Sequence, residues 1–130
     1  MYPNSDAIST DICVPISRLS KVLEETIRDI ENSGIPGPIL GHVGDGNFHS
    51  LLVMKKGNDK DKQKAIELAE NMSKRALENG GTVTGEHGVG MGKIKFMEAE
   101  HGEGWNIMKE IKNQLDPKNI LNPGKLVLLN

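Results

Sequence analysis

The chain is poor in cysteine and in aromatic residues, and its charges nearly balance. A single cysteine among 130 residues excludes an internal disulfide and favours a reducing compartment. Two Phe, one Tyr and one Trp are too few for a surface that stacks on nucleic-acid bases. A net charge of -2 gives no basic field to attract phosphates. We therefore expect no nucleic-acid partner.

Long hydrophobic runs are absent as well. No apolar stretch approaches the roughly 20 residues that span a bilayer, so we expect no transmembrane segment. Residues 1–9 have neither the basic nor the apolar part of a signal peptide, and we expect a disordered lead-in or the start of an excised segment there. A location in the cytoplasm, or peripheral to the inner membrane, is the expectation that follows.

Three segments have the apolar pattern of β-strands. Apolar residues alternate with others along residues 10–17, and a loop leads into a second strand at 38–44. The third strand, at 47–56, is apolar on both faces near its middle, which is typical of a central strand.

Apolar residues at helical spacing predict four helices. The first follows Ser17 as its N-cap and ends at Gly34, and the others cover 59–79, 93–101 and 104–115. The order of elements predicts an α+β fold. We expect an antiparallel sheet with helices packed on one face, resembling part of a ferredoxin-like unit, followed by short C-terminal helices.

Two histidines flank an Asp-Gly pair that is typical of a two-residue hairpin turn. With residues 45–46 at the turn, His42 lies opposite His49, and both side chains emerge on one face of the ribbon. Opposed Cβ atoms lie about 4.5–5.5 Å apart, close enough for both imidazoles to bind one ion. Val43 and Phe48 are then expected to point toward the core.

A histidine pair is an incomplete metal site, because such sites usually have three protein ligands. Glu86 and His87 offer a third ligand, and two histidines with a carboxylate are typical of Zn, Mn or non-haem Fe with open positions. One of the two neighbours would bind metal and the other would serve as a general base. The alternative is that the histidines are only half-exposed polar residues.

The glycine-rich stretch at 80–92 allows the backbone to come close to a ligand, although a mobile surface loop would have the same composition. Its glycine spacing does not match a dinucleotide-binding motif. Cys13 is predicted to be a small strand residue and not a nucleophile, because no partner motif surrounds it.

Four segments of the chain carry a family resemblance. They are TDICVPISRL, GHVGDGNFH, GGTVTGEHGVGMGK and LDPKNILNPGK. In this order and spacing they resemble the C-terminal cap domain of FAD-linked 2-hydroxy-acid dehydrogenases. These are enzymes of the D-lactate dehydrogenase (cytochrome) and glycolate oxidase D-subunit type, in the vanillyl-alcohol oxidase superfamily. The resemblance implies that residues 10–130 are the later part of a cap domain whose FAD-binding domain is not included.

The resemblance also implies roles for individual residues. His42, His49 and Glu86 would hold a divalent metal, which is Zn, Mn or Fe. His87 would be the active-site base beside the flavin, and Asn122 would be a contact on the flavin side. The metal would polarise a small 2-hydroxy acid, D-lactate or glycolate, while hydride leaves for FAD.

By this resemblance, FAD is bound mainly by the missing domain, which is the expected partner of the chain. The isolated chain is then expected to be inactive, and either to self-associate or to have a disordered glycine-rich loop. Two other functions remain open from the residues alone. One is a stand-alone metal-binding α+β domain, either a hydrolase or a metal sensor, and the other is a non-catalytic interaction module.

Overall fold

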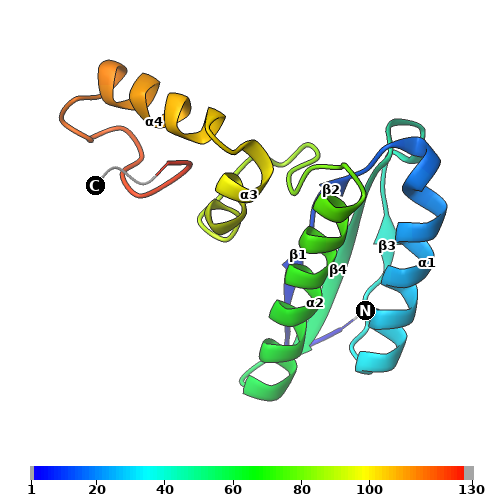
Figure 1. The fold of residues 1–130 in the computed structure, drawn as a ribbon. Coiled ribbons are helices and arrows are strands. Elements are labelled where there is room, and N and C mark those ends of the chain that lie inside the picture. The colour runs from blue at the N-terminus through cyan, green and yellow to red at the C-terminus, as the bar shows by residue number, and fades with distance from the viewer. Residues whose placement is uncertain (1, 128–130) are drawn as a thin grey trace. The chain divides into compact units, whose positions relative to one another are not determined.

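A computed structural model describes residues 2–127 of the chain. The chain forms two units, the first of residues 1–86 and the second of residues 87–130. The first unit contains a four-stranded antiparallel sheet and two long helices, and the second contains shorter helices and turns (Figure 1). The α+β class predicted from the sequence is confirmed.

The central strand of the sheet is β4 (Asn47–Lys55). Strands β1 (Ser5–Ser9) and β2 (Ile12–Cys13) pair along one side of β4, and β3 (Ile39–Leu40) pairs along the other, all antiparallel. The central position predicted for the strand at 47–56 is therefore confirmed.

The lead-in expected at residues 1–9 is partly wrong, because Ser5–Ser9 form strand β1. This segment has little apolar alternation, and it is ordered by the backbone of β4 alongside it. Thr10 anchors its end: the Thr10 N–H donates to the Ser50 carbonyl at 2.9 Å, and the Ser50 N–H donates to the Thr10 hydroxyl at 2.8 Å.

Helices α1 (Ile16–Ser33) and α2 (Asp59–Glu78) pack against each other and cover one face of the sheet, as predicted (Figure 1). Alternate residues of β4 point to this face and are buried beneath the helices; they are Phe48, Leu52 and Met54. The remaining β4 side chains, Asn47 and His49 among them, therefore point to the other face.

The helix boundaries follow ordinary capping rules. Gly34 ends α1 with φ 72°, as predicted, and the Asn58 side chain caps α2 by accepting two backbone N–H groups of its first turn. The N-cap of α1 differs from the prediction, because Pro15 occupies it and Ser17 lies inside the helix. Within residues 2–127, no helix is long and apolar enough to cross a membrane.

Arg75 links α2 to α1. Its Nε lies 3.1 Å from a Glu25 carboxylate oxygen, one Nη group donates to the Thr26 hydroxyl at 3.1 Å, and the other pairs with Asp29. The Arg75 side chain is 16% exposed, so these contacts are largely shielded from water.

Arg75→Met should lower the free energy of unfolding by about 2 kcal/mol, because three polar partners on α1 lose the guanidinium. Arg75→Lys keeps the charge but cannot reach all three partners, so it should lose about half as much. Urea unfolding followed by circular dichroism measures both changes. Equal stability of the three proteins would contradict the role given to Arg75.

The second unit contains η2 (Ile94–Phe96), α3 (Met97–His101) and α4 (Gly104–Leu115), close to the predicted helices at 93–101 and 104–115. Trp105 is buried, whereas several apolar side chains of this unit are more than half exposed. These are Met91, Ile107, Ile111, Leu115, Ile120, Leu121 and Leu126. The predicted self-association stays a prediction, and Leu128 and Leu129 of the tail lie outside the described residues.

Asp116 fixes the turn that follows α4. Its carboxylate accepts the backbone N–H groups of Ile120 at 3.0 Å and Leu121 at 2.9 Å, and it pairs with Lys112. The hydrogen bond from Lys112, helped by the two backbone donors, holds the pKa of Asp116 below its ordinary value against the opposing effect of burial.

Acidification should loosen this turn. Because the folded-state pKa of Asp116 is lowered, its carboxylate stabilises the turn above pH about 4, and the stabilisation is lost as the pH falls through the lowered pKa. Hydrogen exchange at the Ile120 and Leu121 amides, corrected for intrinsic rates, should lose protection over that range. In Asp116→Asn, protection should be low at every pH, and acid-independent protection in the unchanged chain would contradict the assignment.

Candidate metal centre

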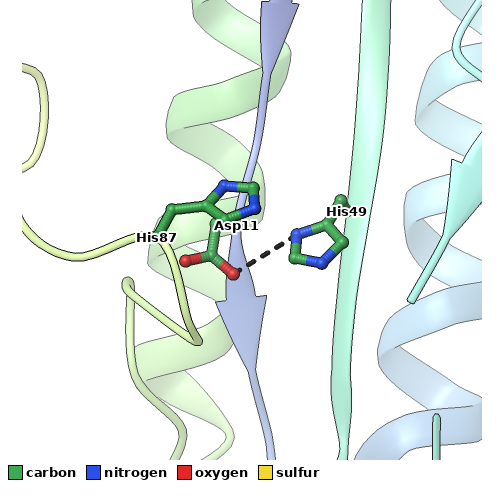
Figure 2. A group of neighbouring side chains, drawn as sticks. All are labelled: Asp11, His49 and His87. Carbon is green, nitrogen blue, oxygen red and sulfur yellow. Dashed lines mark ion pairs between the residues drawn. The ribbon is translucent and has the colours of Figure 1, made fainter. Parts of the chain in front are cut away.

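Asp11 and His49 are cross-strand neighbours on the sheet face that the helices leave open. Ile12 pairs with Phe48, so the next position along the two strands places Asp11 opposite His49. Asp11 Oδ1 lies 3.3 Å from His49 Nδ1 (Figure 2), and both side chains are buried. The first unit therefore holds a buried carboxylate–imidazole pair.

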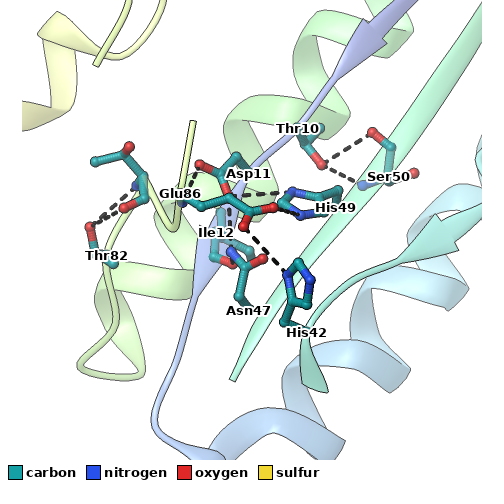
Figure 3. A network of polar contacts seen from close by, with 10 residues as sticks. Thr10, Asp11, Ile12, His42, Asn47, His49, Ser50, Thr82 and Glu86 are labelled. Carbon is teal, nitrogen blue, oxygen red and sulfur yellow. Dashed lines mark hydrogen bonds and ion pairs between the residues drawn. The ribbon is translucent and has the colours of Figure 1, made fainter. Parts of the chain in front are cut away.

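The Asp11 carboxylate is fixed by further hydrogen bonds (Figure 3). Asn47 Nδ2 donates to Asp11 Oδ1 at 2.9 Å and to the Ile12 carbonyl at 3.0 Å. The backbone N–H of Glu86 donates to Asp11 Oδ2 at 2.9 Å. One carboxylate thus connects β2, β4 and the loop that carries Glu86.

Gly85 allows this loop to come close to the sheet. A Cβ atom at residue 85 would lie 1.8 Å from Asn47 Nδ2 and 2.7 Å from Asp11 Oδ1, so no larger residue fits there without displacing both side chains. This close approach places the Glu86 carboxylate at the imidazole of His49, with Oε1 2.8 Å from Nε2.

His42 reaches the same carboxylate from the opposite edge of the sheet. It follows β3, and its Nδ1 lies 3.4 Å from Glu86 Oε2 (Figure 3). One ligand atom can be chosen from each of His42, His49 and Glu86 so that all three lie within 4.8 Å of one another. The structure therefore brings together the three side chains that the sequence suggested as metal ligands.

The route by which the histidines meet differs from the predicted hairpin. Leu40, and not His42, is the partner of His49, and a 3-10 turn, η1 (Val43–Asp45), replaces the two-residue turn. The observed pairing is shifted from the predicted pairing by an even number of residues. Because side chains alternate between the two faces, His42 stays on the predicted side of the ribbon. Phe48 lies in the core as predicted, whereas Val43 is 58% exposed because it belongs to the turn.

Sequence reasoning missed Asp11 and Asn47. A signal for Asp11 was available, because it alternates with the buried residues Ile12 and Val14 and so must face away from the helices. Its position beside His49 became visible only with the pairing of β2 and β4, which joins residues far apart in the chain.

The arrangement of acceptors fits a bound cation. His49 faces a carboxylate oxygen at each ring nitrogen, but a neutral imidazole has only one N–H to donate. A metal ion beside the ring nitrogen that carries no hydrogen would give that nitrogen a partner. The two N···O separations toward Glu86, 2.8 and 3.4 Å, are close to the roughly 3.0–3.4 Å between ligands that each lie about 2.1 Å from one ion.

Cys13 lies near this cluster without nucleophilic character. Its thiol donates to the Asp45 carbonyl at 3.2 Å. Burial, with the negative charges of Asp11 and Asp45, raises the pKa of the Cys13 thiol above its ordinary value. A raised pKa keeps the thiol protonated near neutral pH, which agrees with the structural role predicted for this residue.

The two remaining predicted site residues lie in the second unit. His87 is its first residue, and the His87 side chain is exposed. Asn122 has φ 48° and lines a cavity of about 520 Å³, together with Lys112, Leu121 and Lys125. The catalytic role of His87 and the flavin contact of Asn122 stay predictions.

Curated relatives match nearly the whole chain. It is 46% identical over 130 residues to the probable mitochondrial D-lactate dehydrogenase of Danio rerio, covering 99% of the chain and 26% of that protein. It is 41% identical over 128 residues to the mitochondrial D-lactate dehydrogenase [cytochrome] of Arabidopsis thaliana, covering 98% and 23%. The glycolate oxidase subunit GlcD of Bacillus subtilis is 37% identical over 121 residues, covering 92% and 26%.

The chain thus spans about a quarter of the length of these relatives. A solved structure of 4-ethylphenol oxidase from Gulosibacter chungangensis has a similar fold, with a TM-score of 0.72 at 19% identity over 95% of this chain and 25% of that one. The family described as "FAD linked oxidases, C-terminal domain" matches residues 1–126. The chain therefore belongs to the family of C-terminal domains of FAD-linked oxidases.

Proposed function

We propose that this chain supplies the metal-binding part of the active site of an FAD-dependent dehydrogenase. The substrate would be a small 2-hydroxy acid, D-lactate or glycolate, which is oxidised to the 2-oxo acid. Family membership and the names of the relatives support the reaction class. The observation that carries the proposal is the convergence of His42, His49 and Glu86 on the open face of the sheet.

In this proposal His42, His49 and Glu86 hold a divalent metal, which is Zn, Mn or Fe. When bound, the metal supplies Lewis-acid chemistry that polarises the hydroxyl and carboxylate oxygens of the substrate. The carboxylates of Glu86 and Asp11 balance the charge of a divalent ion. The His42 side chain is 68% exposed and that of Glu86 45% exposed, which leaves this side of the cluster open to a substrate.

His87 is the base in this proposal. It follows Glu86 in the chain, and the Glu86 N–H is fixed by Asp11, so the backbone that leads into His87 is held at the cluster. A ring nitrogen of His87 would accept the proton of the substrate hydroxyl. FAD held by the partner domain would supply the acceptor for the hydride that leaves the substrate Cα.

The partner in this proposal is an FAD-binding domain, which would hold most of the cofactor, with Asn122 as a contact on the flavin side. The exposed apolar residues of the second unit support such a partner, because apolar patches of this kind are typical of interaction surfaces. The cellular location, in the cytoplasm or peripheral to the inner membrane, stays a prediction.

Removing a ligand should weaken metal binding. His49→Ala and Glu86→Gln should each lower the affinity for Mn²⁺ or Zn²⁺ by more than about 100-fold, because each removes one of three protein ligands. Titration calorimetry of the 130-residue chain measures the affinity, and circular dichroism verifies that each variant folds.

Two histidine variants serve as controls for this experiment. His101→Ala makes the same change in α3, away from the cluster, and should leave the affinity unaltered. His87→Ala should also retain the metal if His87 is the base. Loss of metal in His87→Ala with retention in Glu86→Gln would exchange the two roles, and an unchanged chain that binds no metal would contradict the proposal.

The chain alone should neither retain FAD nor oxidise D-lactate or glycolate. Flavin phosphates are usually held by a glycine-rich turn that opens a long helix, whereas the stretch at 80–92 leads into the 3-10 turn η2. Gel filtration of the chain after incubation with FAD, followed by visible absorbance and a dye-reduction assay, tests this expectation. A yellow, active protein would contradict it.

A further inference from the structure

We infer that Asp11 is a positioning residue for the metal centre. Its buried carboxylate would orient the His49 imidazole and the Glu86 backbone toward the same cation, without binding that cation itself. The inference rests on the proposed function, because it assigns Asp11 a task only if His49 and Glu86 are metal ligands.

Asp11 influences which nitrogen of His49 is available to a cation. Nδ1 lies 3.3 Å from Asp11 Oδ1, and Nε2 lies 2.8 Å from Glu86 Oε1. A carboxylate accepts but cannot donate, so Asp11 favours a proton on Nδ1. That proton leaves the Nε2 lone pair directed to the side where Glu86 stands. Metal-binding histidines commonly have their second nitrogen fixed in this way, and the partner also raises their basicity.

Asp11 also holds the loop that supplies the carboxylate ligand. Asp11 Oδ2 accepts the backbone N–H of Glu86 at 2.9 Å, so the residue that supplies the carboxylate is attached to the same side chain as His49. Gly85 makes this hydrogen bond possible by removing the side chain that would separate the loop from Asp11. Asp11 thus fixes two ligands that come from different segments of the chain.

Asp11 is itself held in place by its neighbours. Asn47 Nδ2 uses its two hydrogens on Asp11 Oδ1 and on the Ile12 carbonyl, which fixes the plane of the carboxylate. Asp11 is 3% exposed and His49 is 6% exposed, so the contact between them is little screened by water. A rigid, buried carboxylate is what a positioning role requires.

His42 provides a contrast within the same site. Its ring approaches Glu86 through Nδ1, and its side chain is 68% exposed. A metal bound at Nδ1 leaves the Nε2–H of His42 on the exposed side of the ring. The two histidine ligands should therefore differ in how fast their remaining N–H exchanges with water.

Asp11→Asn tests the role through metal affinity. An amide offers one acceptor where the carboxylate offers two, so the contacts to His49 and Glu86 cannot both survive. We expect the affinity of the 130-residue chain for Mn²⁺ or Zn²⁺ to fall by about 10- to 100-fold. Asp116→Asn makes the same change at an equally buried carboxylate in the second unit, and it should leave the affinity unaltered.

A spectroscopic measurement separates positioning from general loss of structure. In the chain loaded with Co²⁺, imidazole N–H protons of the bound histidines shift far outside the usual proton range. We expect one slowly exchanging signal, from the buried Nδ1–H of His49 that faces Asp11, and one rapidly exchanging signal from the exposed His42. In Asp11→Asn the slow signal should become fast or disappear while the shifts of His42 persist.

The outcomes distinguish this inference from the proposed function. If the unchanged chain binds none of Mn²⁺, Zn²⁺ and Co²⁺, both this inference and the proposed function fail. If the unchanged chain and Asp11→Asn bind metal equally, the inference alone is overturned. Rapid exchange of both imidazole protons in the unchanged chain also overturns it, and this measurement holds even if Asp11→Asn fails to fold.

Discussion

Side chains of β4 alternate between the two faces of the sheet, and the rest of the first unit depends on that alternation. Phe48, Leu52 and Met54 pack beneath the helices, and burial of each such side chain contributes about 1.5–3 kcal/mol. A slip of one residue would expose all three and would bury Asn47 and His49 among apolar side chains. The core therefore fixes the register, and the register places the polar residues of the candidate metal centre on the open face.

The candidate metal centre is assembled from separate segments of the chain that the sheet brings together. Asp11 directly precedes strand β2 and His49 lies on strand β4, while Glu86 is on a loop that Gly85 allows to come close. Only His42 is close to His49 along the chain, and it is the most exposed member of the cluster. The buried residues of the site, Asp11 and His49, thus come from segments far apart in the sequence. The local hairpin contributes His42, which faces solvent.

This division explains what the sequence could predict. Local signals placed Gly34, the helix at 59–79 and the central strand correctly, because caps and periodicity act within a few residues. The expectation of a disordered lead-in was wrong for Ser5–Ser9, because these residues are ordered by pairing with β4 and not by their own composition. The predicted pairing of His42 with His49 was wrong because the connection contains a 3-10 turn, which is longer than the two-residue turn that the Asp-Gly pair indicated. Asp11 could not be assigned until the pairing of distant strands was known.

The charges of the cluster connect its fold to its function. Two carboxylates, the buried Asp11 and the 45% exposed Glu86, flank His49, and positive charge between them would offset their mutual repulsion. A divalent ion would provide that charge and would engage His42 as well. Because Asp11 is also hydrogen-bonded to the loop at Glu86, the ion that compensates the charges would also hold the loop against the sheet. Metal binding and the order of the loop should therefore be thermodynamically coupled.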